Sequence, residues 1–149
     1  MTVAFTGHRG LKHSAVVVYL RLFRTIKKLI GEGADTFICG GAIGFDTMAA
    51  QVVLLLRKRY PIKLRIVVPC KDQDARFSAA QKQEYARILA AADEVTVLAE
   101  RYYRGCMHVR NRYMVEGCNL LVSYCYDSKG GSAYTTNFAL EREKPVIYL

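Results

Sequence analysis

The sequence predicts an α/β fold in which helices cover both faces of a doubly wound, mainly parallel sheet of about six strands. Short Val-, Ile- and Leu-rich runs alternate with helical stretches from one end of the chain to the other. These runs lack polar residues at alternate positions, which is typical of strands that are covered on both faces. The helical stretches are long enough to connect strands by crossovers, so the sheet is expected to be parallel.

The individual elements follow from the same alternation. The predicted strands cover residues 3–5, 36–39, 64–68, 94–98, 120–124 and 146–148. The predicted helices cover residues 15–30, 47–59, 78–92, 107–116 and 132–142. Ser14 and Asp46 are expected to cap the first two helices, and SAAQ at 78–81 fits a capping box for the third. Because no linker, repeat or low-complexity segment interrupts the pattern, residues 1–149 are predicted to form one Rossmann-like domain.

The composition is that of an ordinary globular protein with an excess of positive charge. Hydrophobic residues make up 52% of the chain and charged residues 23%, which is enough apolar material for a core. The 22 Lys and Arg residues outnumber the 13 Asp and Glu residues and give a net charge of +9. This excess favours an anionic partner, such as a nucleotide, a nucleic acid or an acidic protein. The positive residues are dispersed, however, and solvated helix faces account for most of them.

The chain carries no signal for a membrane, for export or for a metal. No apolar run approaches the roughly 20 residues that span a bilayer, so no membrane partner is expected. The N-terminal sequence MTVAFTGHRG does not resemble a secretory signal, and a cytoplasmic location is expected. Five cysteines without a CxxC pair argue against a disulfide framework or a zinc ribbon. Cys106 and His108 have no second pair of ligands beside them, so neither a metal nor a cofactor is expected.

Glycine, hydroxyl, amide and basic residues gather directly after the predicted strands. The carboxyl ends of parallel strands share one edge of a sheet, and ligands of doubly wound folds bind there. The five loops at this edge comprise residues 6–9, 40–46, 69–73, 101–111 and 127–132. The residues expected to bind a ligand in the resulting crevice are Thr6, Gly7, His8, Arg9, Gly40, Gly41, Ala42, Gly44, Asp46, Arg110, Asn111, Lys129, Gly130, Gly131, Ser132 and Thr135.

The loop GGAIG, residues 40–44, leads from a strand into a helix. Glycines without side chains let backbone N–H groups approach a phosphate, and the helix N-terminus adds a favourable dipole. The spacing is neither GxGxxG nor that of a P-loop. Asp46 at the helix start is unfavourable beside a phosphate and suits a ribose hydroxyl or a base amine better. A tight turn in which Asp46 only caps the helix remains an equally supported interpretation.

The loop KGGS, residues 129–132, opens a second helix and is a second candidate for a phosphate site. Its glycines, the hydroxyls of Ser132 and Thr135, and the charge of Lys129 would surround the phosphate. A flexible turn with Ser132 as the helix cap is the alternative. Two such helix starts facing one crevice strengthen the ligand hypothesis.

Five further residues near the strand ends have side chains suited to a nucleotide. Arg110 can hold a phosphate bidentately, and Asn111 can hydrogen-bond the edge of a base. His8 follows the first strand directly, a position that favours a contact with a ligand, although a lone histidine is more often structural. Tyr102, and Tyr103 beside it, are suited to stack on a base, although loop tyrosines more often pack against their own domain.

Six segments in this order resemble the SLOG superfamily, the Rossmann-like domains related to the LONELY GUY and DNA-processing protein A folds. Within it, the chain looks like a domain-of-unknown-function family of small bacterial and phage proteins. The segments run almost end to end: FTGHR, FICGGAIGFDTMAA, LRKRYPIKLRIVVPCKDQ, YARILAAADEV, YYRGCMHVRNRYMVEGCNLLV and KGGSAYTTNFAL. The resemblance implies that a nucleotide or a nucleotide-derived ligand binds in the crevice.

The LONELY GUY branch cleaves the N-glycosidic bond of nucleoside monophosphates, and the chain departs from its motifs. Residues 110–114 match RKxxM with Asn111 in place of lysine. In PGGxGTxxE the glutamate position falls on Asn137, and Ala133 replaces the third glycine. An amide cannot act as a carboxylate base, so this mechanism is not expected unless Arg110 works with a different carboxylate, Glu141, one turn further on.

Three functional hypotheses remain. The first is a module that binds, senses or sequesters a nucleotide or a nucleotide-derived molecule, without catalysis. The second is an N-glycoside hydrolase that uses Arg110 and Glu141. The third is a protein that binds single-stranded nucleic acid, since GGSAYTTNFA is similar to the GSxxT helix start of DNA-processing protein A. The resemblance also makes a homodimer plausible through the apolar helix at 47–56, although burial inside the domain explains that helix equally well.

Overall fold

The structure is a computed structural model that describes all 149 residues. Its single sheet has six strands: β1 (Thr2–Gly7), β2 (Thr36–Cys39), β3 (Lys63–Val68), β4 (Glu94–Val97), β5 (Leu120–Tyr124) and β6 (Val146–Tyr148). Its five helices are α1 (Ala15–Gly31), α2 (Phe45–Arg57), α3 (Ala79–Ala91), α4 (Cys106–Glu116) and α5 (Gly131–Glu141). The predicted fold class is confirmed, and every predicted strand and helix is present.

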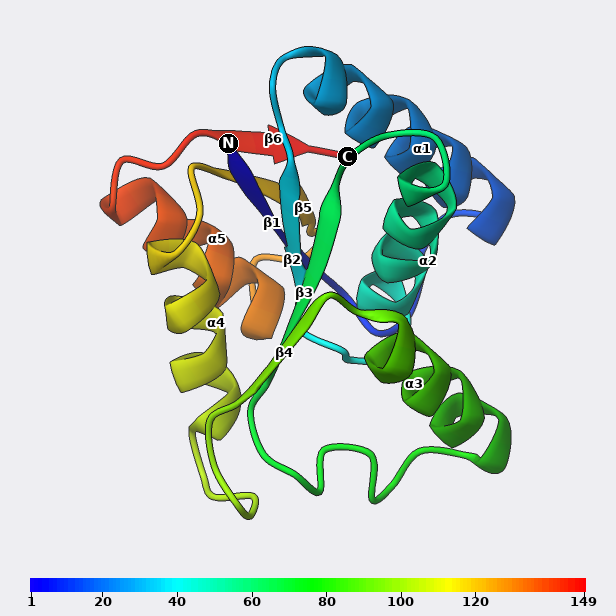
Figure 1. Cartoon of the computed structure of the whole chain (residues 1–149). Helices are drawn as coiled ribbons and strands as arrows, with labels where there is room; N and C mark the ends of the chain where they lie inside the picture. Colours follow the sequence, from blue (N-terminus) through cyan, green and yellow to red (C-terminus); the bar gives the residue numbers. More distant parts are fainter.

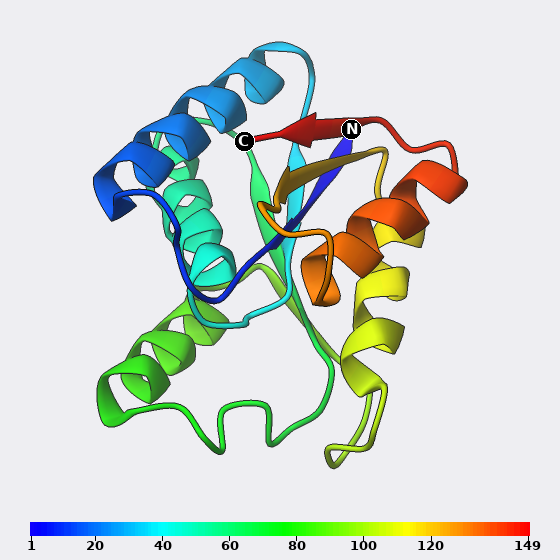
Figure 2. The ribbon, with the colours of Figure 1, turned by 180° about the vertical axis from the view of Figure 1, so that it is seen from behind.

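The sheet is parallel throughout, with the strand order β4-β3-β2-β1-β5-β6. Helices α1, α2 and α3 cover one face, whereas α4 and α5 cover the other (Figures 1 and 2). The chain moves outward from β1 to β4 and then returns to the opposite side of β1 with β5. The loops after β1 and β5 therefore diverge toward opposite faces, which makes this the switch point where such folds bind ligands.

Two apolar layers hold the sheet between the helices. The larger cluster lies under α1, α2 and α3 and includes Phe5, Phe37 and Ile66. The smaller cluster lies under α4 and α5 and includes Ile38 and Val67, the neighbours of Phe37 and Ile66 in the chain. Successive strand residues thus enter opposite layers, which explains why apolar residues follow one another directly along the strands.

Helix starts differ from the predictions in two cases. The capping box at α3 is confirmed: the Gln81 backbone N–H donates to Ser78 Oγ at 3.2 Å, and the Ser78 backbone N–H donates to Gln81 Oε1 at 2.9 Å. Asp46 is not the cap of α2, because that helix begins at Phe45 with Gly44 as its N-cap. Ser14 occupies the N-cap of α1 but forms no side-chain capping hydrogen bond.

Helix α2 is the central helix of its layer and contacts α1, α3 and the first three strands. Its apolar residues Ala49, Val52, Val53 and Leu56 are buried in this layer, and Leu55 is the large apolar side chain that stays exposed. This helix therefore offers little apolar surface for the homodimer expected of it, and dimerisation stays a prediction. None of the helices has the length and apolar character that a membrane crossing requires.

The loop after β1 rests directly on the start of α2, and Gly44 permits this approach. Gly44 has a φ of +79°, and a Cβ there would lie 2.1 Å from the backbone oxygen of Arg9. The Phe45 backbone N–H donates to the His8 carbonyl at 3.3 Å in the same place. The two loops that flank the crevice are thus held together through their backbones.

We expect Gly44→Ala to lower the free energy of unfolding by about 2 kcal/mol or more, because the new methyl group meets backbone and the φ is unfavourable for alanine. Gly31→Ala is the matched control, since a Cβ at Gly31 meets nothing within 4 Å at the end of α1. The control should leave stability unchanged or raise it by up to about 1 kcal/mol. Urea unfolding of both variants measures the difference, and equal stabilities would contradict the close approach.

Candidate functional site

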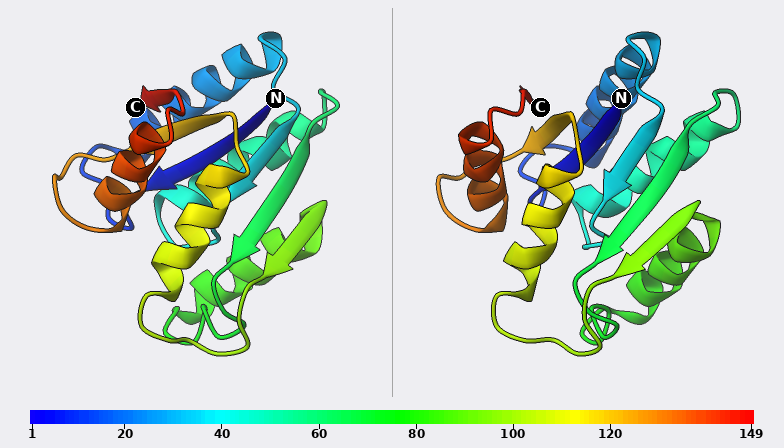
Figure 3. Two further views of the ribbon diagram at one scale, coloured as in Figure 1. Left: turned by 90° about the vertical axis from the view of Figure 1, so that its left-hand side faces the viewer. Right: turned by 60° about the vertical axis from the view of Figure 1, so that its left-hand side comes forward.

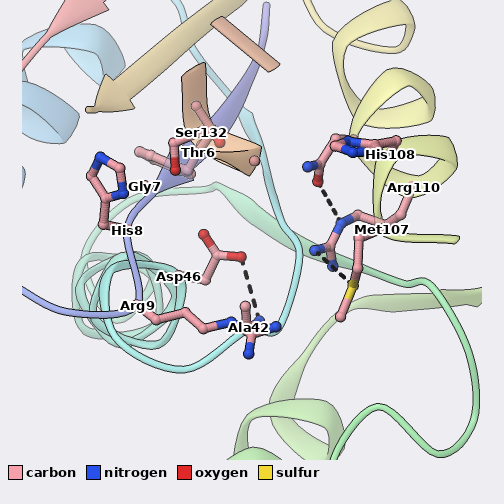
Figure 4. Close-up of a pocket in the computed structure, with 13 residues that line it drawn as sticks. Thr6, Gly7, His8, Arg9, Ala42, Asp46, Met107, His108, Arg110 and Ser132 are labelled. Carbon is pink, nitrogen blue, oxygen red and sulfur yellow. Dashed lines mark hydrogen bonds between the residues drawn. The ribbon is translucent and has the colours of Figure 1, made fainter. Parts of the chain in front are cut away.

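A cavity of about 400 Å³ opens at the carboxyl ends of the strands, between the layers of α2 and α4 (Figure 4). Segments that are far apart in sequence meet at this edge of the sheet (Figure 3), and residues from several of them line the cavity. The sequence-predicted residues that line it are Thr6, Gly7, His8, Arg9, Ala42, Asp46, Arg110, Asn111, Gly131 and Ser132. The predicted residues that do not line it are Gly40, Gly41, Gly44, Lys129, Gly130 and Thr135. The loop at 69–73 also stays outside its lining.

The end of β1 forms one wall. Gly7 lies against the ring of Phe45, where an added Cβ would come within 2.3 Å of the ring, so only glycine fits. His8 Nε2 accepts a hydrogen bond from the Tyr126 backbone N–H at 3.2 Å, and the two rings lie 4.1 Å apart between centroids. Arg9 follows with an exposed side chain, which leaves its guanidinium available to a ligand.

The glycines of GGAIG lie behind the cavity and serve packing. A Cβ at Gly40 would meet the guanidinium of Arg110 at 2.5 Å and Asp46 Oδ2 at 2.9 Å. Gly41 has a φ of +74° and lies against Tyr85. These contacts, like that of Gly44, fill the space that a phosphate would need, and Ala42 is the part of this loop that lines the cavity.

Asp46 lies in the first turn of α2, at the floor of the cavity, and its side chain is 7% exposed. Its Oδ2 accepts a hydrogen bond from the Ala42 backbone N–H at 3.4 Å. Burial raises the pKa of this carboxyl from its ordinary value of 3.8 to about 6, although the positive charges of Arg110 and Arg9 pull it down. Asp46 is therefore a buried carboxylate near neutral pH, with a positive group on either side.

Arg110 is buried, and its Nε and Nη1 donors are used within the protein, whereas Nη2 meets only Met107 Sδ at 3.8 Å. Its guanidinium donates to the carbonyls of Gly40 and Val67, and Nε donates to Asn111 Oδ1 at 2.7 Å. Burial lowers the pKa of Arg110 from its ordinary value, and the charge of Asp46 opposes this effect. The side chain lines the cavity, but its donors are not arranged for the bidentate phosphate contact that the sequence suggested.

The start of α5 forms the wall opposite the loop after β1. The helix begins at Gly131, with Gly130 as its N-cap at a φ of +97°, so Ser132 is a first-turn residue and not the cap. A Cβ at Gly131 would meet nothing within 4 Å. Thr135 is buried and donates to the Gly131 carbonyl at 2.8 Å, while Lys129 lies in the exposed loop before the helix. The N–H groups in the first turn of α5 thus have no carbonyl partners within their own helix, and this turn lies at the cavity.

Three cavity-lining residues, Phe5, Met107 and His108, were missing from the sequence prediction. His108 stacks on Tyr134 of α5 with 4.2 Å between ring centroids, and Arg112 donates to the Tyr134 hydroxyl at 3.3 Å. A second histidine–tyrosine pair thus matches that of His8 on the other side. The spacing of His108 and Asn111, three residues apart on one helix, is the sequence signal that marks them as neighbours.

The carboxylate proposed for the hydrolase hypothesis is in the wrong place. Glu141 is the last residue of α5, exposed, and ten residues beyond the turn that lines the cavity. At 1.5 Å per residue this corresponds to about 15 Å along the helix axis. Asn137 is also exposed and does not line the cavity. The acidic side chain at the cavity is Asp46, so the pairing of Arg110 with Glu141 is not supported.

Asp46 is expected to make the free energy of unfolding depend on pH. Its pKa is about 6 in the folded chain and returns to about 3.8 on unfolding, so the folded state binds more protons between these values. The stabilisation present below about pH 4 is therefore lost as the pH rises through 6. Across this range, Asp46→Asn should gain stability relative to the wild type, on the order of 3 kcal/mol. Urea unfolding of both proteins at several pH values measures the gain, and a constant difference would contradict the burial.

Known proteins resemble the chain along most of its length. A UPF0398 protein of Halalkalibacterium halodurans is 32% identical over 146 residues, which cover 95% of this chain and 75% of the relative. The SPbeta prophage-derived protein YoqJ of Bacillus subtilis is 35% identical over 133 residues, which cover 80% of this chain and 78% of that protein. Bacterial and phage relatives both occur, as the resemblance in the sequence suggested.

A solved structure and a family model complete the comparison. DNA processing protein A from Helicobacter pylori, in a study of its single-stranded DNA binding mode, has the same fold with a TM-score of 0.73 at 20% identity. The similarity covers 99% of this chain and 64% of that one, so this chain spans less than two thirds of its length. The model of the YpsA family, described as the YspA SLOG family, matches residues 8–148. This match covers nearly the whole chain, which therefore belongs to the YpsA family of the SLOG superfamily.

Proposed function

We propose that the cavity binds a nucleotide or a nucleotide-derived small molecule, and that the protein senses or sequesters this ligand. The observation that carries the proposal is the open N-terminus of α5, which faces a buried carboxylate and a free arginine across one cavity. A volume of about 400 Å³ falls within the range of small-molecule sites, roughly 300–1,000 Å³.

The start of α5 is the part of the cavity suited to a phosphate. Its first-turn N–H groups and helix dipole favour an anion, and Gly131 leaves the space in front of them open. Arg9 adds a mobile positive charge from the opposite wall. The start of α2 is less suitable, because Asp46 occupies its first turn and would repel a phosphate.

The aromatic pairs give a ligand its second recognition element. His8 and His108 line the cavity, and each packs against a tyrosine ring, that of Tyr126 and that of Tyr134. Flat faces of this kind stack on a nucleobase. Phosphate, polar and stacking groups around one cavity match the parts of a nucleotide better than those of an inorganic anion.

Gly131→Glu tests the phosphate site without disturbing the fold. A glutamate in the first turn of a helix favours the helix, but its charge repels a phosphate at that place. We expect binding of the four ribonucleoside 5′-monophosphates, followed by the amide shifts of 15N-labelled protein, to weaken by about tenfold or more for the nucleotide that binds. Gly131→Ala is the matched control and should change binding little, because its methyl group enters open space. Equal affinities of both variants, or no binding of any nucleotide to the wild type, would contradict the proposal.

A second candidate function is binding of single-stranded nucleic acid, and exposed tyrosines favour it. Tyr102 is 62% exposed and Tyr103 46%, in the loop that leads into α4, and Arg101 and Arg104 flank them. Tyr126 is 42% exposed beside the cavity, with Lys12 Nζ 5.7 Å from its ring centroid. Stacking tyrosines between basic side chains are typical of single-strand binding surfaces. The fold shared with DNA processing protein A adds support for this candidate.

Thymidine oligonucleotides of increasing length test this second function. If the tyrosines stack on bases, Tyr102→Ala combined with Tyr103→Ala should weaken binding by about tenfold or more, and the affinity should fall steeply with salt. Tyr148→Ala is the control, because Tyr148 is 61% exposed on the edge strand β6. An affinity that is independent of salt and equal in both variants would contradict nucleic-acid binding.

A further inference from the structure

Asp46 has one carboxylate oxygen without a partner in the protein. Its Oδ2 accepts from the Ala42 backbone N–H, whereas no hydrogen bond is formed by Oδ1. The residue is 7% exposed, and it lines the cavity. In Figure 4 this second oxygen points away from Ala42, on the side where Thr6 and Ser132 are drawn. An acceptor without a partner that faces a cavity in this way is available to a ligand.

The charged groups around Asp46 do not satisfy this oxygen. Arg110 of α4 is the strongest positive influence on it, but its hydrogen bonds go to backbone carbonyls and to Asn111. Arg9, from the loop after β1, lies at the exposed mouth of the cavity. Cys39 of β2 is buried next to the carboxylate, and burial together with the charge of Asp46 raises the pKa of its thiol, which stays neutral.

The ligand group that meets Asp46 must therefore donate hydrogen bonds. An ionised carboxylate only accepts, so a phosphate oxygen is excluded from this position and a hydroxyl or an amine is favoured. If the phosphate of a ligand lies at Ser132, the part of the ligand that is bonded to this phosphate lies over Asp46, on the floor of the cavity. In a nucleoside 5′-monophosphate this group is the sugar, and the base lies on its far side, toward the histidine–tyrosine pairs.

We propose that Asp46 accepts hydrogen bonds from the ribose hydroxyls of the bound nucleotide, so that the cavity selects ribonucleotides over 2′-deoxyribonucleotides. This inference rests on the proposed nucleotide function. Oδ1 has lone pairs for both hydroxyls of the ribose, and a 2′-deoxyribose removes one of these donors. Since hydrogen bonds to charged groups are stronger than those between neutral groups, the loss is expected to be large for a single hydroxyl.

The ionisation state of Asp46 gives an independent signature of its contact with the ribose hydroxyls. Donors that approach the carboxylate favour its ionised form and lower its pKa, whereas a phosphate placed beside it would raise the pKa. Because the pKa of Asp46 is about 6 in the free protein, both shifts fall in a range where the protein can be titrated. The direction of the shift thus tells which part of the ligand lies on the floor.

The first test compares adenosine 5′-monophosphate with 2′-deoxyadenosine 5′-monophosphate on the wild-type protein. We expect the deoxynucleotide to bind roughly ten- to a hundredfold more weakly, as for the loss of one hydrogen bond to a charged group. In Asp46→Asn the two affinities should converge, because a neutral amide replaces the charged acceptor. Asp127→Asn is the matched control, since it removes the same charge from the exposed loop before α5 and should keep the discrimination.

The second test follows the side-chain carboxyl carbon of Asp46 by NMR as the pH is changed, with and without adenosine 5′-monophosphate. The midpoint should fall below 6 when the nucleotide binds and should fall less with the deoxynucleotide. Equal affinities of the two nucleotides, or a midpoint that rises on binding, would overturn the role of Asp46 and leave the nucleotide function standing. A wild-type protein that binds neither nucleotide would overturn the proposed function itself.

Discussion

The site depends on one buried positive charge. Arg110 reaches from α4 across the edge of the sheet to the carbonyls that end β2 and β3, those of Gly40 and Val67. A charge in the interior is tolerated only with such partners, and here two backbone oxygens and the carboxylate of Asp46 supply them. Gly40 has to be glycine, because the guanidinium occupies the place of its side chain. This arrangement fixes α4 against the strand ends and sets the floor of the cavity.

The charges around the cavity divide it into parts of different chemistry. The carboxylate of Asp46 makes the floor unfavourable for anions, although two arginines lie near it. The free helix N-terminus at Gly131 makes the opposite wall favourable for them. Arg9 is exposed between solvent and cavity, whereas Arg110 is tied into the protein. The two arginines therefore differ in role: Arg110 builds the site, and Arg9 is free to meet what enters it.

The strand–helix alternation was predictable because parallel strands covered on both faces leave a strong apolar signal. The segments predicted as loops after these strands, residues 6–9, 101–111 and 127–132, could be assigned to one edge for the same reason, and they contain most of the cavity-lining residues. The sequence could not distinguish a glycine that makes room for a ligand from a glycine that makes room for other atoms of the protein. Gly40 and Gly44 are of the second kind, since the atoms they approach belong to Arg110 and Arg9, far away in the chain.

The side chains of α4 and α5 were harder to predict. His108 became part of the cavity only through the packing of α4 against α5, which places it on Tyr134. Glu141 was considered because of a motif alignment, which ignores the length of the helix between it and the cavity. Asp46 was expected either as the cap of a helix that starts at residue 47 or as a ligand-binding residue; the helix starts two residues earlier, at Phe45, so Asp46 lies in its first turn and lines the cavity.

The pairing of β5 with β1 joins strands more than a hundred residues apart, with Val3 beside Leu120 and Gly7 beside Tyr124. Such contacts form late, because the chain between the two strands loses conformational entropy on closing before the contacts offset that loss. During synthesis the ribosome delivers β1 to β4 first, as four of the six strands with α1, α2 and α3 on one face. That intermediate has the floor carboxylate but neither α5 nor the tyrosine that holds His8. A nascent chain therefore remains without a complete binding site until its last third docks, so ligand cannot assist the first stage of its folding.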